Sequence, residues 1–502
     1  MPPASGEPAH FPSSRFRFLN VERELIQSSD WNNPAWGKLW LYNLHYFDDL
    51  NAAGSESREE SHRALMRRWI DENPPGVGNG WEPYTLSLRI VNWIRWALAG
   101  YGLASAELHS LSIQCRYVRR RLEVHLLGNH LLANAKALVF GGIFFEGDEA
   151  QEWLNKGLEI LAREIPEQIL PDGGHFERSP MYHSIILVDL LDLLNLVQTY
   201  PGALSSRWQR FPAEWRVRAM AMLRWLRAMT HPDGKIALFN DAAFGIASEL
   251  QKIEAYASRL GVLAMHELDT LVHLSDSGYI RAHSGPACAF LDVGNIGPDY
   301  LPGHAHADTL SFELSLFDRR VIVHSGTSCY ETNAERLRQR STAAHNTVEI
   351  DCENSSEVWG SFRVARRARP FGLELLQSDD LIRVCCAHDG YRRLRGHPVH
   401  RREWVLRQTG MTVTDTVDGS FGKAIARFHF HPDCSVSRAD ENEGAMSLGA
   451  GRELRWSIEK EHGRGRLLES TYHPEFGMSV RNKCLEVELV GSRACTQFDW
   501  SV

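Results

Sequence analysis

The sequence predicts two domains, a helical domain followed by an antiparallel β-sandwich. From about residue 60 to 265, apolar residues recur at the three-and-four spacing of amphipathic helices. Beyond residue 274, short runs of alternating or continuous apolar character are separated by turn residues. A chain of 502 residues is long enough for two cores. We therefore expect a helical domain at 21–270 and a β domain at 275–502, with the boundary at 265–278, after a loosely ordered segment 1–20.

The helical half consists of apolar-periodic segments joined by short turns that contain Gly or Pro. The segments are 63–69, 85–99, 111–127, 131–140, 150–165, 181–197 and 215–230. Periodicity alone leaves a helical bundle and an α/α toroid both open.

The β half shows short strand-like runs punctuated by turns. They are 279–282, 287–293, 309–316, 321–323, 346–350, 381–385, 402–406, 410–416 and 424–430. In 309–316 the apolar residues fall at every second position, which predicts a half-buried strand.

Composition describes an ordinary globular protein and excludes several classes. The net charge of -8 argues against a nucleic-acid partner, although local arginine clusters at 116–121 and 363–369 leave polyanion binding open. Nine cysteines without C-x-x-C spacing predict reduced thiols and no zinc ribbon. We see no secretory signal and no run near the roughly 18 apolar residues of a membrane helix. We expect a cytoplasmic protein by default, with periplasmic or secreted locations open, and no membrane partner.

An unusually aromatic stretch, 39–50, precedes the helical repeats. It places aromatic rings beside Asn43, His45 and Asp48. Two readings are equally open: a wall that packs on sugar rings, and a core helix with incidental polar residues.

Two polar clusters lie in the helical half. In the first, Gly128 reads as the end of one helix and Asn129 as the cap of the next, with His130 in the first turn; alternatively, the pair could hold an anion. The second is the segment 172–183, which packs seven ionisable or hydrogen-bonding side chains before an apolar helix and therefore predicts a site. Tyr182 is its candidate acid or base.

The β half carries a third cluster, in which His304, His306 and Asp308 alternate just before a strand. If that segment is extended, the three side chains point the same way. His324 ends a nearby strand and His345 begins another. His306, His324 and His345 form a plausible zinc set, while three separately hydrogen-bonded histidines are the alternative.

The chain resembles the heparinase II/III family of polysaccharide lyases. The resemblance rests on five motifs in the family's order and at similar separations, spread over about 220 residues and both domains. They are Gly128-Asn-His130, Asp172-Gly-Gly-His-Phe-Glu-Arg-Ser-Pro-Met-Tyr182, Gly303-His-Ala-His-Ala-Asp308, His324-Ser-Gly326 and His345-Asn-Thr347. The fold that this implies is an N-terminal α/α toroid (an incomplete barrel) followed by an antiparallel β-sandwich.

The resemblance also implies an activity: β-elimination at uronic acids of an anionic polysaccharide, either glycosaminoglycan-like or a bacterial capsular or exopolysaccharide. Asn129, with His130 nearby, would neutralise the uronate carboxylate. Tyr182 and His304 would move the protons, and the choice of base depends on whether the C5 proton lies syn or anti to the leaving group.

The remaining expectations concern binding and metal. Candidate substrate contacts are His175, Glu177, Arg178, Asn43 and Tyr84. His306, His324 and His345 match the positions of a structural zinc, although relatives with a well-defined zinc carry aspartate in place of His324. Asp308 is left to orient a histidine. No organic cofactor is expected, and the oligomeric state stays open. The rival functions are a non-catalytic polysaccharide-binding or assembly protein of the same fold and a zinc hydrolase.

Overall fold

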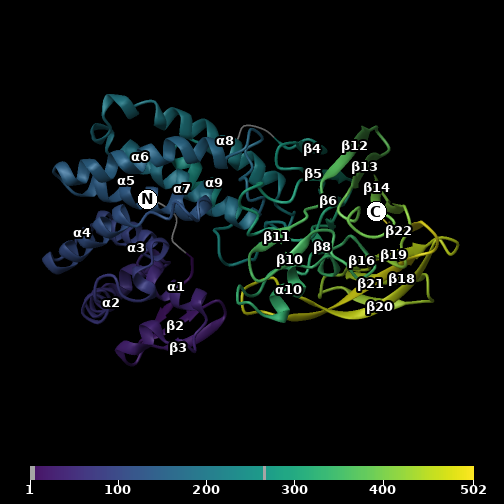
Figure 1. The fold of residues 1–502 in the computed structure, drawn as a ribbon, viewed down its shortest axis with the longest axis horizontal. Coiled ribbons are helices and arrows are strands. Elements are labelled where there is room, and N and C mark those ends of the chain that lie inside the picture. The colour runs from purple at the N-terminus through teal and green to yellow at the C-terminus, as the bar shows by residue number, and fades with distance from the viewer. Residues whose placement is uncertain (1–5, 264–266, 502) are drawn as a thin grey trace. The chain divides into compact units, whose positions relative to one another are not determined.

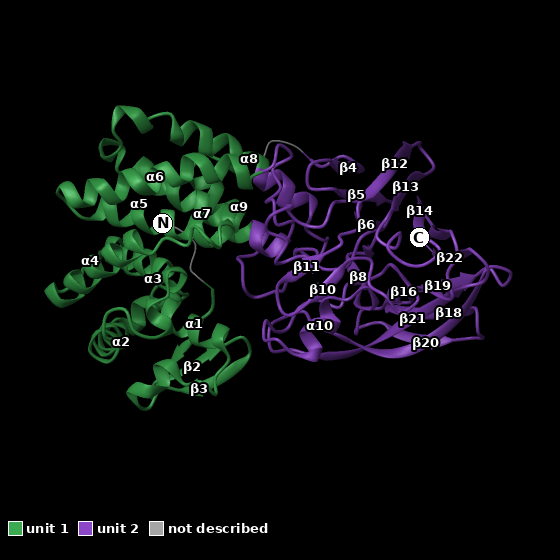
Figure 2. Ribbon diagram, viewed as in Figure 1, with its two compact units in different colours: residues 1–169, 184–221, 251–263 green, residues 170–183, 222–250, 264–502 purple. Residues whose placement is uncertain are grey.

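The computed structural model describes residues 6–263 and 267–501. The chain divides into two compact units, which Figure 2 colours separately. Unit 1 comprises residues 1–169, 184–221 and 251–263; unit 2 comprises 170–183, 222–250 and 264–502. The last of these divisions falls between residues 263 and 264, next to the predicted boundary at 265–278; residues 264–266 lie outside the described part. Two segments of the predicted helical half, 170–183 and 222–250, belong with the β half in unit 2.

Unit 1 begins with a small antiparallel sheet rather than a loose segment. Its strands are β1 (His10–Phe11), β2 (Arg15–Phe18) and β3 (Val21–Glu24). The backbone N–H groups of Ala9 and His10 donate to one carboxylate oxygen of Asp49, at 2.7 and 3.1 Å. The expectation of a loosely ordered N-terminus is therefore wrong for its described residues.

The helices that follow confirm the predicted helical half (Figure 1). They are α1 (Lys38–Tyr46), α2 (Glu59–Glu72), α3 (Pro83–Trp96), α4 (Ser105–Arg120), α5 (Gly128–Phe144), α6 (Asp148–Gln168), α7 (Pro180–Thr199), α8 (Phe211–Ala228) and α9 (Leu250–Arg259). Helices α7 and α8 each contribute residues to both units.

The pair α5 and α6 shows how the helical layer packs. Their connection is so short that the two helices must run antiparallel as neighbours. A Cβ atom on Gly142 would lie 2.5 Å from the backbone nitrogen of Leu154, and one on Gly157 would lie 2.7 Å from the carbonyl oxygen of Ala135. These glycines therefore permit a closer approach of the two backbones than any larger residue would.

The aromatic stretch 39–50 is mostly core. Trp40, Tyr46 and Phe47 are buried, and the ring of Phe47 packs edge-on against Trp93 at 5.6 Å between centroids. The amide of Asn43 donates to the carbonyl oxygen of Leu39 at 2.8 Å, a bond within its own helix. The structure thus supports the core-helix reading over a sugar-stacking wall.

Among the described residues, one helix is long and apolar enough to cross a membrane, judged by length and composition alone. It is α7, and 83% of its most apolar 18-residue window is buried. The sequence reading had expected no such run. A buried core helix passes the same test.

Unit 2 is built from antiparallel sheets. The five-stranded sheet has the order β4-β5-β6-β7-β8, the four-stranded sheet β20-β21-β16-β9 and the eight-stranded sheet β12-β13-β14-β15-β22-β19-β18-β17; β10 and β11 pair as a separate hairpin. The strands are β4 (Leu271–Leu274), β5 (Tyr279–Ser284), β6 (Ala287–Asp292), β7 (Phe312–Leu316), β8 (Arg319–Ile322), β9 (Val348–Ile350), β10 (Glu357–Trp359), β11 (Arg363–Ala365), β12 (Pro370–Gln377), β13 (Ile382–His388), β14 (Val399–Arg407), β15 (Gly410–Asp418), β16 (Ala424–His429), β17 (Ser435–Arg438), β18 (Glu443–Gly449), β19 (Arg452–Ile458), β20 (Gly463–Tyr472), β21 (Val480–Leu489) and β22 (Arg493–Trp500). A short helix, α10 (Ala334–Arg340), lies between β8 and β9.

One apolar core joins the three large sheets. Phe312 from the five-stranded sheet, Phe428 from the four-stranded sheet and Trp404 from the eight-stranded sheet belong to the same buried cluster. Strand β7 is buried on both faces, so the prediction of a half-buried strand is wrong. Its polar residue Glu313 is accommodated because His231 and the backbone N–H of Leu238 bind the carboxylate at 2.9 and 3.0 Å.

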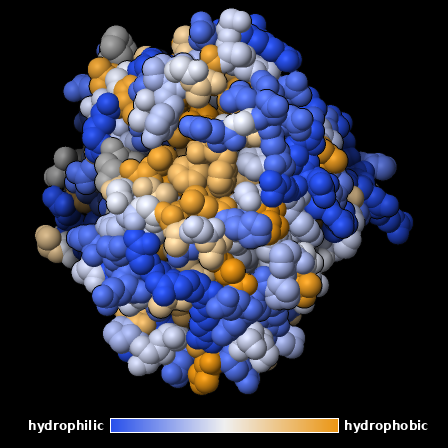
Figure 3. Space-filling view, turned by 90° about the vertical axis from the view of Figure 1, so that its left-hand side faces the viewer, coloured by the Kyte–Doolittle hydropathy of each residue, from blue (hydrophilic) through white to orange (hydrophobic). Residues whose placement is uncertain are grey.

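Figure 3 looks onto one face of the molecule. Hydrophilic side chains surround a smaller apolar area near its centre. Among the residues drawn in colour there, no continuous apolar belt crosses this face.

Position 326, in the His324-Ser-Gly326 motif, requires glycine because the backbone of His473 lies very close to it. Gly326 has φ +76°, and a Cβ there would lie 2.1 Å from the carbonyl oxygen of His473. We expect Gly326→Ala to lower the free energy of unfolding by about 2–4 kcal/mol, combining left-handed strain with overpacking. Urea denaturation measures this; Gly451→Ala, also at positive φ but with open space around its Cβ, should show only the smaller strain cost. Equal losses in the two variants would contradict the packing argument.

Candidate active site

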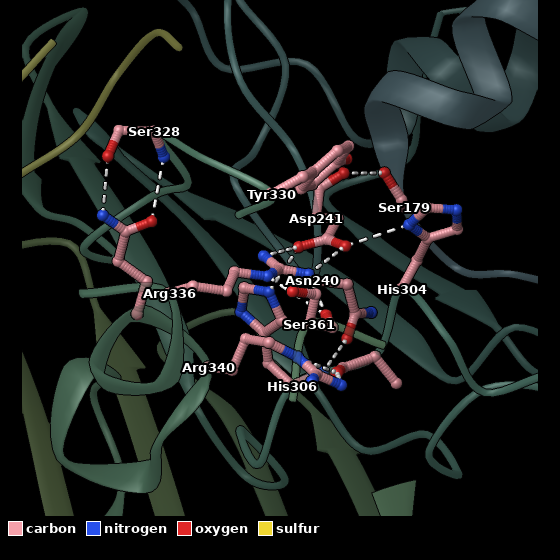
Figure 4. Close-up of polar contacts among 12 residues, drawn as sticks. Ser179, Asn240, Asp241, His304, His306, Ser328, Tyr330, Arg336, Arg340 and Ser361 are labelled. Carbon is pink, nitrogen blue, oxygen red and sulfur yellow. Dashed lines mark hydrogen bonds and ion pairs between the residues drawn. The ribbon is translucent and has the colours of Figure 1, made fainter. Parts of the chain in front are cut away.

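Two histidines of the Gly303–Asp308 motif converge on one carboxylate. The motif is not a strand extension, because β7 begins only at Phe312. His304 Nδ1 lies 2.9 Å from Asp241 Oδ2, and His306 Nε2 lies 2.8 Å from Asp241 Oδ1 (Figure 4). A backbone hydrogen bond also joins Asp241 to His304, since the Asp241 N–H donates to the His304 carbonyl oxygen at 3.0 Å. The sequence had assigned the orienting role to Asp308, and Asp241 holds it instead.

Arg336 of α10 completes the surroundings of Asp241. Its guanidinium donates to both carboxylate oxygens, with Nη2 2.7 Å from Oδ2. Both side chains are fully buried. Burial acts to raise the pKa of Asp241, but Arg336 and the two histidines outweigh it and hold the pKa well below its usual value. The carboxylate is therefore ionised and accepts four charge-assisted or ring N–H bonds.

Tyr182 lies beside His304 within the same compact unit. It occupies the first turn of α7, where its backbone N–H donates to Ser179 Oγ at 3.3 Å. Ser179 Oγ in turn donates to the Asp241 carbonyl oxygen at 2.6 Å. The rings of Tyr182 and His304 are 4.0 Å apart between centroids, and the hydroxyls of Tyr182 and Tyr330 are 3.1 Å apart. The sequence had placed Tyr182 with the helical domain; the structure groups its segment with the β half.

Hydrogen bonding determines which nitrogen of His304 is open. An ionised carboxylate only accepts, so His304 Nδ1 carries the hydrogen that Asp241 receives. In the neutral ring, Nε2 then presents a lone pair. That nitrogen is 4.0 Å from Glu177 Oε2, and the side chain retains 16% of its surface exposed. His304, whose ring packs against that of Tyr182, can therefore accept a proton at Nε2.

Unit 1 carries its own polar group at the start of α5. The helix begins at Gly128 and its cap is Leu127, at φ 57°, so Asn129 is inside the first turn and does not cap the helix. His130 Nδ1 lies 3.1 Å from Glu123 Oε1, and the His130 ring is 4.4 Å from that of Tyr84. The cap reading of Asn129 is thus wrong.

A group that could hold a metal lies in unit 2. Asp308, His324 and His345 bring ligand atoms within 4.8 Å of one another. Asp308 Oδ2 is buried without a hydrogen-bond donor among the described residues. The His324 ring makes no hydrogen bond of ordinary geometry there, and its pKa is lowered to about 4 by burial, against the Glu313 charge and the Leu238 backbone, which raise it. A neutral imidazole is the form that binds a metal.

The contact between His306 and His345 also suits a cation. The Ser341 carbonyl, 2.7 Å from His345 Nδ1, fixes the hydrogen on Nδ1, and Asp241 fixes the hydrogen of His306 on Nε2. The two remaining lone-pair nitrogens face each other at 3.1 Å. A shared proton or a shared cation relieves this, and two nitrogens on a tetrahedral zinc are roughly 3.3 Å apart, given Zn–N bonds of about 2.0–2.1 Å. The residues fit zinc, with Asp308 supplying the carboxylate.

The described residues contain a second potential metal group, His10, Asp49 and His62 in unit 1. Arg58 Nε lies 3.1 Å from Asp49 Oδ2, and His62 Nε2 lies 2.7 Å from the same oxygen. The other oxygen receives the Ala9 and His10 backbone N–H groups. Because a guanidinium already neutralises this carboxylate, the group is explained without a metal.

Two models of protein families match most of this chain. The family model described as heparinase II/III N-terminus matches residues 46–260, and the model described as heparinase II/III-like, C-terminal, matches 267–501. The chain belongs to the heparinase II/III-like family.

Individual relatives and solved structures are also similar to this chain. A heparin-sulfate lyase of Bacteroides stercoris is 27% identical over 260 residues, covering 47% of this chain and 38% of that enzyme. FtsZ-localized protein C of Caulobacter vibrioides is 25% identical over 92% of this chain and 84% of its own length. The crystal structure of heparinase III matches with a TM-score of 0.75 at 17% identity, covering 96% of this chain and 79% of that chain. This chain spans 38% to 50% of the heparin-sulfate lyases that it matches.

The structure shows where several residues expected to bind substrate lie in this heparinase II/III-like chain. His175 has no exposed surface. Arg178 donates to the carbonyl oxygens of Asn295 and Asp276, which ties two loops together. Glu177 is nearly buried but faces His304, and Tyr84 contacts His130.

Sequence reasoning missed three residues of this site in the heparinase II/III-like fold. Asp241 binds His304 and His306, Arg336 binds Asp241, and Tyr330 contacts Tyr182. The pair Asn240-Asp241 directly after the apolar run Ala237-Leu-Phe239 was an available signal for Asp241. Arg336 had none, because arginines on a short polar helix are usually solvated.

Proposed function

We propose that this protein is a polysaccharide lyase that cleaves a uronic-acid-containing anionic polysaccharide by β-elimination, leaving a 4,5-unsaturated uronate at the new non-reducing end. The observation that carries the proposal is the contact of Tyr182 with His304, whose tautomer Asp241 fixes. Family membership and the heparin-sulfate lyases among the relatives support the same reaction class and a glycosaminoglycan-like substrate.

The chemical difficulty is the C5 proton of the uronate, which is only weakly acidic. One group must remove this proton while another protonates the departing O4. When the C5 proton and O4 lie on opposite faces of the sugar, His304 Nε2 accepts the C5 proton and the Tyr182 hydroxyl donates to O4. Tyr182 serves in both steps when they lie on the same face.

Acidity at C5 also requires that the neighbouring carboxylate be neutralised. The proposal gives this task to Asn129, whose amide is not used as a helix cap, with His130 beside it. A hydrogen-bond donor aimed at developing negative charge is commonly the largest single contribution to such catalysis. Asn129→Ala should therefore lower kcat by about 10²–10³.

We further propose a structural zinc held by Asp308, His324 and His345, with His306 adjoining. A zinc held by these residues would supply a fixed positive charge. Protein purified in zinc-containing medium should contain about one zinc per chain by mass spectrometry, and chelation should lower its Tm. His324→Ala should lose the metal, whereas His283→Ala, an only partly buried histidine of the same unit, should keep it. Full metal retention in His324→Ala would contradict the assignment.

The test of the lyase proposal is an absorbance assay with a panel of uronic-acid polysaccharides that includes capsular and exopolysaccharides. The unsaturated product absorbs in the ultraviolet, and we expect absorbance to rise with at least one polymer. The alternative, a non-catalytic polysaccharide-binding or assembly protein, predicts binding without a product. No rise with any bound polymer would contradict the proposal.

A further inference from the structure

The hairpin of β10 and β11 lies against the proposed catalytic histidine. Phe362, in its turn, meets His304 edge-on at 5.6 Å and Tyr330 at 5.2 Å between ring centroids. The Arg336 guanidinium is 5.4 Å from the Phe362 centroid. Despite these contacts, 42% of Phe362 is exposed. An aromatic residue that touches the histidine and keeps an open surface is placed to meet a substrate.

Two buried arginines of α10 hold this turn rigidly. Arg336 Nη2 donates to the Ser361 carbonyl oxygen at 2.9 Å while also binding Asp241 (Figure 4). Arg340 donates to the carbonyl oxygens of Gly360 and Arg363, both at 3.3 Å. The position of Phe362 is therefore linked to the carboxylate that orients His304. A pre-positioned side chain loses little entropy when a ligand binds.

The hairpin also presents a second aromatic ring and an unpaired positive charge. Trp359 is 49% exposed and pairs directly across the hairpin with Arg363, so the two side chains share a face. Arg366 pairs with Glu357 and Arg367 with Asp299, whereas Arg363 enters no ion pair within the described ranges. Exposed rings beside a free guanidinium match a sugar chain that carries anionic groups.

We propose that the 357–365 hairpin is a sugar-binding subsite, in which Phe362 and Trp359 pack on sugar rings and Arg363 pairs with a carboxylate or sulfate of the same polysaccharide. This inference rests on the proposed lyase function and names residues that determine its substrate preference. Isolated exposed aromatics need no explanation in general; here the anchoring arginines and the contact with His304 distinguish the site.

The test is a kinetic comparison of hairpin variants on whichever polysaccharide is turned over. Phe362→Ala should raise KM about 3- to 10-fold and leave kcat within about 2-fold, as expected for the loss of one aromatic packing contact. Phe362→Trp should restore KM. Arg363→Gln should raise KM at low salt and have little effect at high salt. The Tm of each variant should stay close to that of the unchanged protein.

Matched controls come from the same unit. Phe371 is 39% exposed on β12, and Phe371→Ala should leave KM unchanged. Arg366→Gln removes a nearby arginine that is already paired and should have a smaller effect than Arg363→Gln. Turnover with unchanged KM in Phe362→Ala and Arg363→Gln would overturn this inference alone. A change in oligomeric state with unchanged KM would instead mark the hairpin as a protein interface and also overturn it. No turnover by the unchanged protein would overturn the lyase proposal and the inference with it.

Discussion

Replacing Asp241 with asparagine is expected to produce the largest combined loss of activity and stability. The amide keeps the shape of the side chain but removes the charge that Arg336, His304 and His306 share. Breaking a buried ion pair by removing one partner costs about 3–5 kcal/mol of unfolding free energy. The His304 tautomer is no longer fixed, and the corresponding change in the Ser-His-Asp triad lowers kcat about 10⁴-fold. We expect a fall in kcat of about 10²–10⁴.

Asp415→Asn is the matched control. Asp415 is also buried in unit 2 and binds a guanidinium through both oxygens, with Arg402 at 2.7 and 2.9 Å and His400 at 2.7 Å. It should lose a similar amount of stability in urea denaturation, yet retain far more activity per folded molecule. Equal kcat in folded Asp241→Asn and Asp415→Asn would contradict the orienting role of Asp241.

The pH dependence of this contribution follows from the direction of the shift. The pKa of Asp241 is held well below its ordinary value in the folded protein. A depressed pKa stabilises the fold above the unfolded-state pKa of about 3.9, and the contribution is lost as pH falls toward the folded-state pKa. The stability difference between the native protein and Asp241→Asn should therefore be constant near neutral pH and shrink only in acid.

Tyr182→Phe is expected to have the second largest effect, confined to catalysis. It removes the hydroxyl that the proposal uses to protonate O4, and a positioned acid or base contributes about 10²–10⁴-fold. The same hydroxyl lies 3.1 Å from that of Tyr330, so stability should fall by only about 1 kcal/mol. Measured kcat should therefore fall by at least about 10², while KM changes little.

Tyr391→Phe controls for the loss of a buried tyrosine hydroxyl. The Tyr391 hydroxyl donates to the Val348 carbonyl oxygen at 2.7 Å in the same unit. This variant should lose comparable stability and keep its activity. If Tyr182→Phe retained activity within a few-fold of the unchanged protein, Tyr182 would be excluded as the acid or base.

The sequence could predict the order of helices and strands because each carries a strong local periodicity. It could not locate the end of α4, predicted to continue to residue 127 but observed to stop at Arg120. Apolar residues Val124 and Leu126 continue the pattern although they are exposed in a turn segment. Local sequence patterns also could not place residues 170–183 in unit 2, because that placement depends on bonds between distant residues, such as those of Asp172 Oδ2 with Ser277.

The residues of the site also fall into two groups, those that a local motif marks and those that only tertiary contacts identify. His304, His306 and Tyr182 could be selected because they stand in dense motifs. Their partner Asp241 lies 63 residues before His304, and Arg336 lies 95 residues beyond Asp241. No spacing rule connects such residues, so tertiary structure was needed to replace Asp308 by Asp241 as the orienting carboxylate and to bring Asp308 into the metal group.

The central claim is that the protein cleaves by elimination and not by hydrolysis. The most direct measurement is cleavage of a responsive polysaccharide in water labelled with the heavy isotope of oxygen, followed by mass spectrometry of the fragments. Elimination adds no water, so we predict one unsaturated non-reducing end at each cut and no more label than an uncut reducing oligosaccharide acquires by exchange in the same water. A label incorporated at every cut, with saturated ends on both fragments, would show hydrolysis and contradict the account.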